Sequence, residues 1–237
     1  MQSYGFTVSA KAHPTWREIR ACKGIENVEI NILPKYAKDV RVRNKVKRYI
    51  HNHDISPTIH AAYDIRNGSV YYLGSALDWA RYLDAEIVTF HASQNLDDRF
   101  LYQNANGVQL LVENSYYLFR LPKIRDYIAN HNLDGVTFNA EKFGKTGVNI
   151  SEAFRQLSPL VGHMHCSNLR DGKRVHLPLG EGVITRGEWK HFFEMLVARS
   201  FHKVIVFDPR EFDYSTRDKF YQSLDYFADL MEEIYFR

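Results

Sequence analysis

The feature that most restricts the fold of this sequence is an alternation of short apolar runs with segments of helical periodicity. The apolar runs are Tyr4 to Ser9, Val28 to Leu33, Thr58 to Ala62, Glu86 to His91, Val108 to Glu113, Gly135 to Asn139, Val161 to His165 and Lys203 to Asp208. Strands that alternate with helices form a parallel sheet, and eight rounds favour closure into a barrel. We therefore predict an α/β fold, a single (β/α)8 TIM barrel domain spanning residues 1–237.

The helical segments between these runs differ in length. They are Trp16 to Lys23, Lys35 to His51, Leu73 to Leu83, Leu121 to His131, Ser151 to Leu157, Arg186 to Ala198 and Thr216 to Phe236. The segment from Ala92 to Gly107 leaves room for little more than a short helix, so we expect a barrel slightly shortened around its fourth βα unit. Such a unit is expected to open the barrel wall, and a second copy of the chain, in a homo-oligomer, could cover the exposed edge.

Charge and hydropathy narrow the classes of partner. The chain has 31 Lys and Arg against 28 Asp and Glu, a net charge of +3, which permits a phosphate-bearing ligand but falls short of a nucleic-acid signature. No window approaches the ~20 apolar residues that span a bilayer, and the first residues lack the layout of a signal peptide. Two cysteines, Cys22 and Cys166, indicate no disulfide framework. We expect a cytoplasmic protein with a small-molecule partner and no membrane segment.

Three histidines, His163, His165 and His176, fall within fourteen residues. The first two are two residues apart in an apolar run, so on a strand they point to the same face. A lone histidine is more often a hydrogen-bonded core residue than a metal ligand. A pair on one face with a third nearby favours a metal site.

Polar residues also end six consecutive predicted strands. They are His60, His91, Glu113, Asn139, His165 and Asp208, and the loop after His165 carries Arg174 and His176. In barrels of this type the reactive groups lie at the carboxyl ends of the strands. Buried polar groups need partners, so six such residues in register indicate a shared site.

The chain resembles the xylose isomerase-like TIM barrels, a superfamily of sugar and sugar-phosphate isomerases and epimerases that also holds the AP endonuclease (family 2) branch. The resemblance rests on the segments Thr58-Ile-His-Ala-Ala-Tyr63, Thr89-Phe-His-Ala92, Leu110-Leu-Val-Glu-Asn114, Gly135-Val-Thr-Phe-Asn-Ala-Glu-Lys142, His163-Met-His-Cys-Ser-Asn168, His176-Leu-Pro-Leu-Gly-Glu-Gly182 and Val204-Ile-Val-Phe-Asp208. It spans nearly the whole chain, and its most specific part is the histidine strand followed by His-x-Pro-Leu-Gly-Glu-Gly.

The isomerase branch implies one divalent metal held by residues from strands five to eight. The corresponding residues here are Glu113, Asn139, His165 and Asp208. Asn139 stands where an Asp is expected, and Asp208 where a Glu is expected. The neutral amide removes one negative charge, so the resemblance implies a weaker metal site, or none.

The endonuclease branch implies two further metals. One uses His60, His91 and Glu113, all present here, whereas the other needs a His at Lys142 and an Asp at Arg174 beside His176. Both of these positions carry cations, which repel a metal ion. A trinuclear phosphodiesterase centre is therefore not expected, and an abasic-site endonuclease is the weakest hypothesis.

Two functional hypotheses remain. In the first, a metal-assisted isomerase or epimerase uses Mn, Zn, Co or Mg to polarise a carbonyl, Glu113 and Asp208 move the proton, and Lys142 stabilises the oxyanion. His60, His91 and His176 then bind a second metal or the substrate. In the second, a diverged, metal-free barrel binds a small anion.

Lys142 and Arg174, with Arg170 nearby, could hold the phosphate or carboxylate of a small ligand, and the alternative is that Arg170 to Arg174 is simply a solvated loop. Two further polar residues have weaker assignments. Glu29 is expected to be structural, and His163 to lie in the core below His165.

Overall fold

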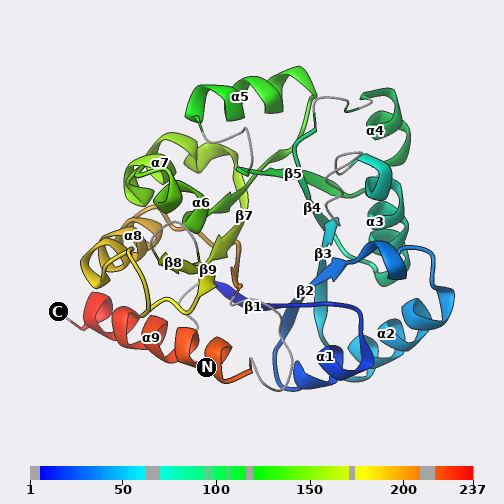
Figure 1. The fold of residues 1–237 in the computed structure, drawn as a ribbon, viewed down its shortest axis with the longest axis horizontal. Helices are drawn as coiled ribbons and strands as arrows, with labels where there is room; N and C mark the ends of the chain where they lie inside the picture. The colour runs from blue at the N-terminus through cyan, green and yellow to red at the C-terminus, as the bar shows by residue number, and fades with distance from the viewer. Residues whose placement is uncertain are drawn as a thin grey trace.

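The computed structural model describes residues 6–61, 70–93, 96, 98–105, 107–115, 120–170, 174–208 and 217–236. Within these ranges eight parallel strands close into a barrel (Figure 1), which confirms the predicted α/β (β/α)8 fold. The strands are β1 (Thr7–Ala12), β2 (Asn27–Ile32), β3 (Ser56–Ala61), β4 (Ile87–His91), β5 (Gln109–Glu113), β6 (Gly135–Asn139), β7 (Val161–Cys166) and β10 (Val204–Phe207).

Helices surround the barrel on its outside (Figure 1). They are α1 (Trp16–Ala21), α2 (Val40–Asn52), α3 (Val70–Leu83), α4 (Asp98–Asn104), α5 (Leu121–Asn130), α6 (Ala140–Lys145), α7 (Ile150–Leu157), α8 (Arg186–Ala198) and α9 (Arg217–Tyr235). No helix among the described residues is both long and apolar enough to cross a membrane.

The barrel wall is closed at the short fourth unit, so the expected opening there is wrong. β4 and β5 pair in parallel over their whole length, from Ile87 opposite Gln109 to His91 opposite Glu113. The short helix α4 supplies enough chain to make the crossover. The fourth unit therefore leaves no unpaired strand edge for a second subunit to cover.

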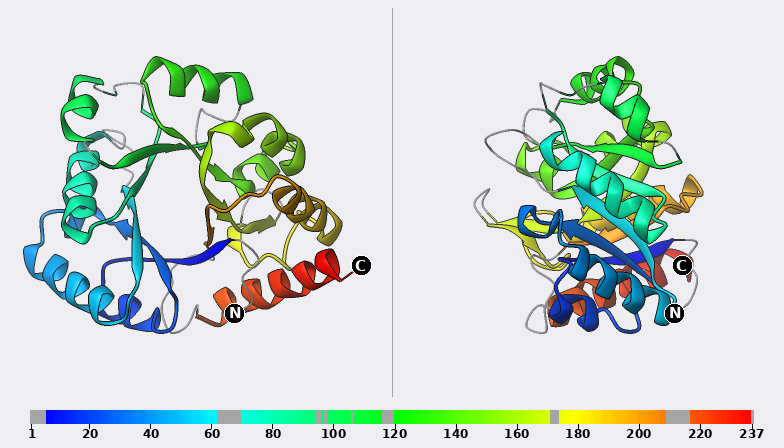
Figure 2. Two further views of the ribbon diagram at one scale, coloured as in Figure 1. Left: turned by 180° about the vertical axis from the view of Figure 1, so that it is seen from behind. Right: turned by 90° about the vertical axis from the view of Figure 1, so that its right-hand side faces the viewer.

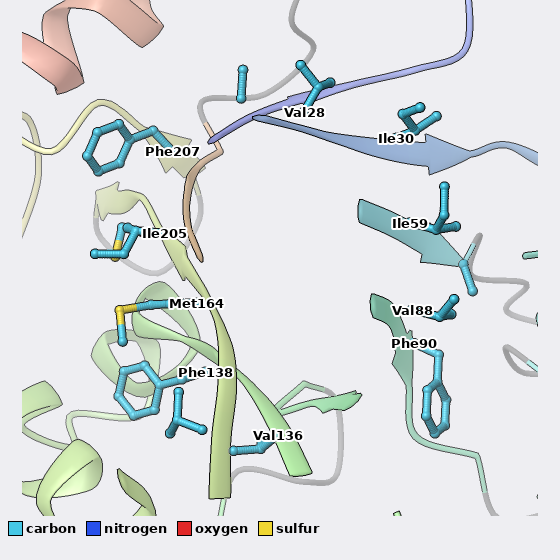
Figure 3. Close-up of a cluster of buried hydrophobic side chains, with 14 of the residues drawn as sticks. Val28, Ile30, Ile59, Val88, Phe90, Val136, Phe138, Met164, Ile205 and Phe207 are labelled. Atoms are coloured by element: carbon cyan, nitrogen blue, oxygen red, sulfur yellow. The ribbon is translucent and has the colours of Figure 1, made fainter. Parts of the chain in front are cut away.

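The two faces of the barrel wall differ sharply in polarity, because successive side chains on a strand point to opposite sides. Figure 3 shows apolar side chains on the outer face, where they lie toward the helices. They include Val28, Ile30, Ile59, Val88, Phe90, Val136, Phe138, Met164, Ile205 and Phe207, all of them buried. Their neighbours in sequence face the interior and are mostly polar: Glu29, Thr58, His60, Thr89, Thr137, His163 and His165 are each at most 4% exposed.

Two predicted elements are shifted in the structure. β1 runs to Ala12 instead of ending at Ser9, which places Lys11 on the strand. The single helix predicted from Lys35 to His51 is split, since a 3-10 turn (Pro34–Tyr36) comes first and Asp39 then caps α2 through the backbone N–H groups of its first turn.

One helix and one two-stranded hairpin were not predicted. α6 begins directly after β6, with Asn139 as its N-cap. β8 (Asn168–Arg170) and β9 (Arg174–Leu177) form an antiparallel hairpin between β7 and α8. The side view in Figure 2 shows this yellow hairpin at one end of the barrel.

Candidate functional site

Three ligand-type side chains meet at the carboxyl ends of neighbouring strands. His60 on β3, His91 on β4 and Glu113 on β5 offer ligand atoms that all lie within 4.8 Å of one another. His60 Nε2 is 3.0 Å from Glu113 Oε2, and His91 Nδ1 is 3.8 Å from the same oxygen. A tetrahedral ion with bonds of 2.0–2.1 Å separates its ligand atoms by roughly 3.3 Å. The two observed distances to Glu113 Oε2, 3.0 and 3.8 Å, lie on either side of that value.

The hydrogen bonding of His60 supports a cation at this place. Its Nδ1 lies 3.1 Å from the carbonyl oxygen of Ala61, which can only accept a hydrogen bond, while its Nε2 faces the Glu113 carboxylate. Burial, and after it the charge of Lys11, lowers the pKa of His60, so the ring is neutral and carries one proton. That proton satisfies one contact only. A metal ion between Nε2 and Glu113 would satisfy the other.

The ring of His165 also directs a nitrogen toward the Glu113 carboxylate. Its Nε2 is 2.9 Å from Glu29 Oε2, and its Nδ1 is 3.6 Å from Glu113 Oε2. This buried Nδ1 has no hydrogen-bond partner. When Nε2 donates to Glu29, the lone pair of Nδ1 faces Glu113, an arrangement typical of a metal-binding histidine oriented by a carboxylate. The donor set therefore fits a divalent metal.

Glu29 lies at the centre of the barrel interior. Its Oε2 also contacts His163 Nε2 at 3.0 Å, and its Oε1 is 3.4 Å from Lys11 Nζ. Burial alone would raise the pKa of this carboxyl group, but His165 and Lys11 outweigh it and hold the pKa well below its usual range. Glu29, predicted to be structural, thus orients the two histidines of β7.

Asn139 contacts Glu113 through its amide nitrogen, while its amide oxygen is bonded elsewhere. Its Nδ2 donates to Glu113 Oε1 at 3.0 Å, and its Oδ1 accepts the backbone N–H of Lys142 as the cap of α6. The oxygen that the sequence assigned to a metal is therefore already bonded. In this geometry Asn139 orients Glu113.

Asp208 is held by Lys11 and His176 at the same end of the barrel. Its Oδ2 lies 3.3 Å from Lys11 Nζ and 3.2 Å from His176 Nδ1. Burial alone would raise the pKa of Asp208, but Lys11 and His176 lower it far below the ordinary value. Burial opposes the ionised form of Lys11 in the same way, and Asp208 and Glu29 outweigh it and raise its pKa well above normal. The structure thus pairs Asp208 directly with Lys11 and His176.

His176 has an unusual backbone for a non-glycine residue, with φ at 60°. Its N–H donates to the Glu141 carboxylate, and its ring nitrogen Nδ1 contacts both the side chain and the carbonyl of Asp208. Burial alone would lower the pKa of His176, but Asp208 outweighs it and raises the pKa. Backbone strain of this kind is retained at functional sites.

Lys142 lies at the same end of the barrel. Its Nζ is 2.9 Å from the fully buried Glu141, which also accepts a hydrogen bond from Ser167 Oγ at 3.0 Å. Burial would lower the pKa of Lys142, but Glu141 and Glu113 raise it. The side chains of His91, Lys142 and His176 are 13%, 20% and 18% exposed. Together with Lys11, which is also 13% exposed, they are the most exposed of these site groups, so an incoming molecule would reach them first.

The remaining predicted residues lie on the hairpin. Arg170 is exposed on β8, and Arg174 begins β9, with its side chain outside the described residues. Sequence reasoning missed Lys11 and Glu141 as members of the site. Lys11 repeats the two-residue period of β1 from Ser9, and Glu141 follows an Asn that is typical of an N-cap.

No family model matches this sequence, and no curated protein matches it. Solved structures do match. A xylose isomerase domain protein from Planctomyces limnophilus is 14% identical with a TM-score of 0.76, covering 97% of this chain and 98% of that one. A D-tagatose 3-epimerase-like protein is 18% identical with a TM-score of 0.74, covering 97% and 100%. A probable 3-DHS dehydratase from Bacillus anthracis is 12% identical with a TM-score of 0.68, covering 93% and 98%.

These matches confirm that the chain has the fold of the xylose isomerase-like TIM barrels, as its motifs predict. The identities are low, so the likeness extends to the fold alone. The dehydratase is similar in fold to the same extent as several epimerases. One fold hosts many reactions, and the reaction must be argued from the site.

Proposed function

We propose that this protein is a metal-assisted isomerase or epimerase of a small sugar or other hydroxy-carbonyl compound. The observation that carries the proposal is the pair of imidazole nitrogens, His60 Nε2 and His165 Nδ1, that face one Glu113 oxygen in a buried site. The similarity in fold to sugar epimerases supports the same reaction class.

His60, His91 and Glu113 would hold the metal, and His165, whose Nδ1 faces the same Glu113 oxygen, would complete the donor set. A donor set rich in imidazole favours Zn, Co or Mn over Mg. The bound ion would polarise the substrate carbonyl and stabilise negative charge on its oxygen. Burial lowers the pKa of His91 to about 3, so its ring is neutral at neutral pH, as a metal ligand must be. Its Nδ1 also lies 2.7 Å from Ser115 Oγ, a contact that a metal bound at Nδ1 would replace.

His176 and Asp208 would move the proton. His176 Nδ1 contacts Asp208, so its Nε2 is left to face the substrate, and its raised pKa lets it hold a proton near neutral pH. Lys142 would stabilise the developing oxyanion. Glu113, assigned a proton-transfer role from the sequence, has both oxygens in contact with His60 and Asn139. Metal binding suits it better.

Deuterium exchange tests the proposal directly. Protein supplied with each of the four metals is incubated in D2O with D-tagatose, D-fructose and D-psicose, and carbon-bound deuterium and new epimers are measured. His91→Ala should lose the metal, and His176→Asn should keep the metal but lower kcat at least a hundredfold, as expected for a lost general acid or base. The matched control is His191→Asn, because His191 is 68% exposed on α8.

A metal-free barrel that binds a small anion is the second candidate. It is favoured by one observation, the ammonium of Lys11 between Glu29 and Asp208, which already neutralises charge that a metal would balance. Elemental analysis separates the two candidates. Less than about a tenth of an equivalent of metal after supplementation, with no deuterium incorporation, would exclude the isomerase and leave this candidate.

A further inference from the structure

A basic groove lies on the outside of the barrel, between α1 and α2 (neighbouring blue helices in Figure 1) and the start of α9. It has a volume of about 1010 Å³, and its lining residues are Trp16, Arg20, Lys23, Lys45, Arg48, Tyr49, Asn52, His53 and Arg217. Five of these nine carry a permanent positive charge and none is acidic. The whole chain has a net charge of only +3, so positive charge is concentrated here.

Four cations of the groove, Arg20, Lys23, Lys45 and Arg48, form no ion pair with an acidic side chain among the residues that the structure describes. Other surface cations of the protein do have such partners: Lys47 pairs with Asp84, Arg81 with Asp78 and Arg155 with Glu152. Lys47 is on the same helix as Lys45. The groove therefore keeps uncompensated charge that an anionic ligand would neutralise.

Helical spacing places these groups on facing surfaces. On α1 and the turn after it, Trp16, Arg20 and Lys23 follow the spacing i, i+4, i+7, and on α2 Lys45, Arg48 and Asn52 follow i, i+3, i+7. Residues at these intervals share one helix face. The two faces line a single groove, so a ligand would be contacted from both sides.

Trp16 gives the groove an aromatic surface. Its side chain is 52% exposed, whereas Trp79 and Trp189, the other tryptophans of the chain, are fully buried. The ring meets Tyr49 edge to face at 5.7 Å, and the Arg20 guanidinium lies 5.6 Å from its centroid. Tyr49 in turn stacks on His53 at 4.0 Å. Trp16 is thus held in place and offers a ring to a flat ligand.

We propose that this groove binds a nucleoside polyphosphate, with the base against Trp16 and the phosphates on Arg20, Lys23, Lys45 and Arg48. Arginine and lysine clusters recognise phosphates, and aromatic side chains stack on bases. The volume suits a ligand of nucleotide size. One exposed tryptophan provides for one base, which favours a free nucleotide over a run of stacked bases in single-stranded nucleic acid.

Titration calorimetry and tryptophan fluorescence with ATP test the proposal. ATP should bind one site per chain and change the emission of Trp16. Arg48→Glu should weaken binding at least tenfold, and Arg41→Glu less than twofold, because Arg41 is exposed on the same helix but does not line the groove. Trp16→Ala should weaken binding about tenfold and Trp16→Phe less than threefold. Circular dichroism checks the fold, and Lys45→Glu replaces Arg48→Glu if that variant misfolds.

Three other probes identify which parts of the ligand the groove recognises. Inorganic triphosphate and adenosine should each bind at least tenfold more weakly than ATP. A triphosphate as tight as ATP would overturn the stacking of a base, and a ten-nucleotide strand that binds tenfold tighter than ATP would overturn the free nucleotide in favour of nucleic acid. Absence of ATP binding, or equal effects of Arg48→Glu and Arg41→Glu, would overturn the site itself.

Discussion

Asn139 shows how one residue can serve a helix and a site at the same time. Its amide oxygen caps α6 and its amide nitrogen holds Glu113. An Asp at this position would keep the cap, since Asp is an equally good N-cap residue. It would also place a second carboxylate against Glu113. The choice of Asn therefore lets the site remain folded when no metal balances the charge.

Asn139→Asp should make stability depend on metal. In the presence of a chelator, loss of the hydrogen bond and the new repulsion should cost about 1–3 kcal/mol, which lowers Tm by roughly 2–10 °C in a domain of this size. Added Zn or Mn should raise Tm more than in the parent protein. Thermal scans with and without metal measure both effects. Asn149→Asp is the control, because Asn149 caps α7 in the same way away from the site. Equal behaviour of the two variants would contradict the assigned role.

Lys11 was overlooked because a lysine in a strand interior contradicts the usual preference for exposure. The sequence analysis therefore ended the first strand before it. In the structure its ammonium is compensated by Asp208 and Glu29, which come from strands far away in sequence. Such compensation depends on three strands at once. The two-residue period from Ser9 could have indicated the position of Lys11 on the strand, but no local pattern could have indicated its partners.

At the scale of elements, the β8–β9 hairpin is held by the side chain of Asn168. Its Nδ2 donates to the carbonyls of Leu179 and Ile184, and its Oδ1 accepts from the backbone N–H groups of Leu169 and Ile184. Gly182 fits closely against it, since a Cβ there would lie 2.8 Å from Asn168 Oδ1. This cluster fixes the loop that follows β9, the strand on which His176 lies.

Asn168→Ala should loosen that loop and leave the metal ligands unaffected. The change leaves several buried backbone groups without a hydrogen-bond partner, and each such group costs about 1–3 kcal/mol. We therefore expect the free energy of unfolding to fall by about 3 kcal/mol or more. Metal content should stay within twofold, while turnover should fall with the misplacement of His176. Urea denaturation, elemental analysis and the deuterium assay measure the three effects. Asn130→Ala, at an exposed position of α5, should change none of them.

α6 and the hairpin also show where sequence patterns fail. α6 has six residues, too few for a helical period to stand out, and its cap, Asn139, was interpreted only as a strand-end ligand. The hairpin strands have only three and four residues, too few for an alternating pattern to stand out. Strands β6 and β7 and helix α8 were predicted to within one residue, because their apolar patterns are long or regular.

For the whole molecule, the alternation of strands and helices was sufficient to predict the closed barrel. It was also sufficient to predict that polar residues gather at one end, because parallel strands bring their carboxyl ends together. Which polar residues touch was not predictable. Partners such as Glu29 with His163 and His165, or Asp208 with Lys11, depend on the register across the barrel interior. A polar interior of this kind also makes the fold sensitive to pH.

The metal-free protein should lose stability as the pH falls from 7 to 5. Burial lowers the pKa of His91 from 6.5 to about 3, and those of His60 and His163 in the same direction. Below pH 6.5 these histidines therefore bind protons in the unfolded chain but not in the native state. The stability that is fully present above pH 6.5 is for this reason lost as the pH falls toward 3. For His91 alone the loss at pH 5 is about 2 kcal/mol. Urea denaturation at pH 7, 6 and 5 measures it. His191→Asn should leave the slope unchanged, and a flat profile would show that these imidazoles are protonated in the native state.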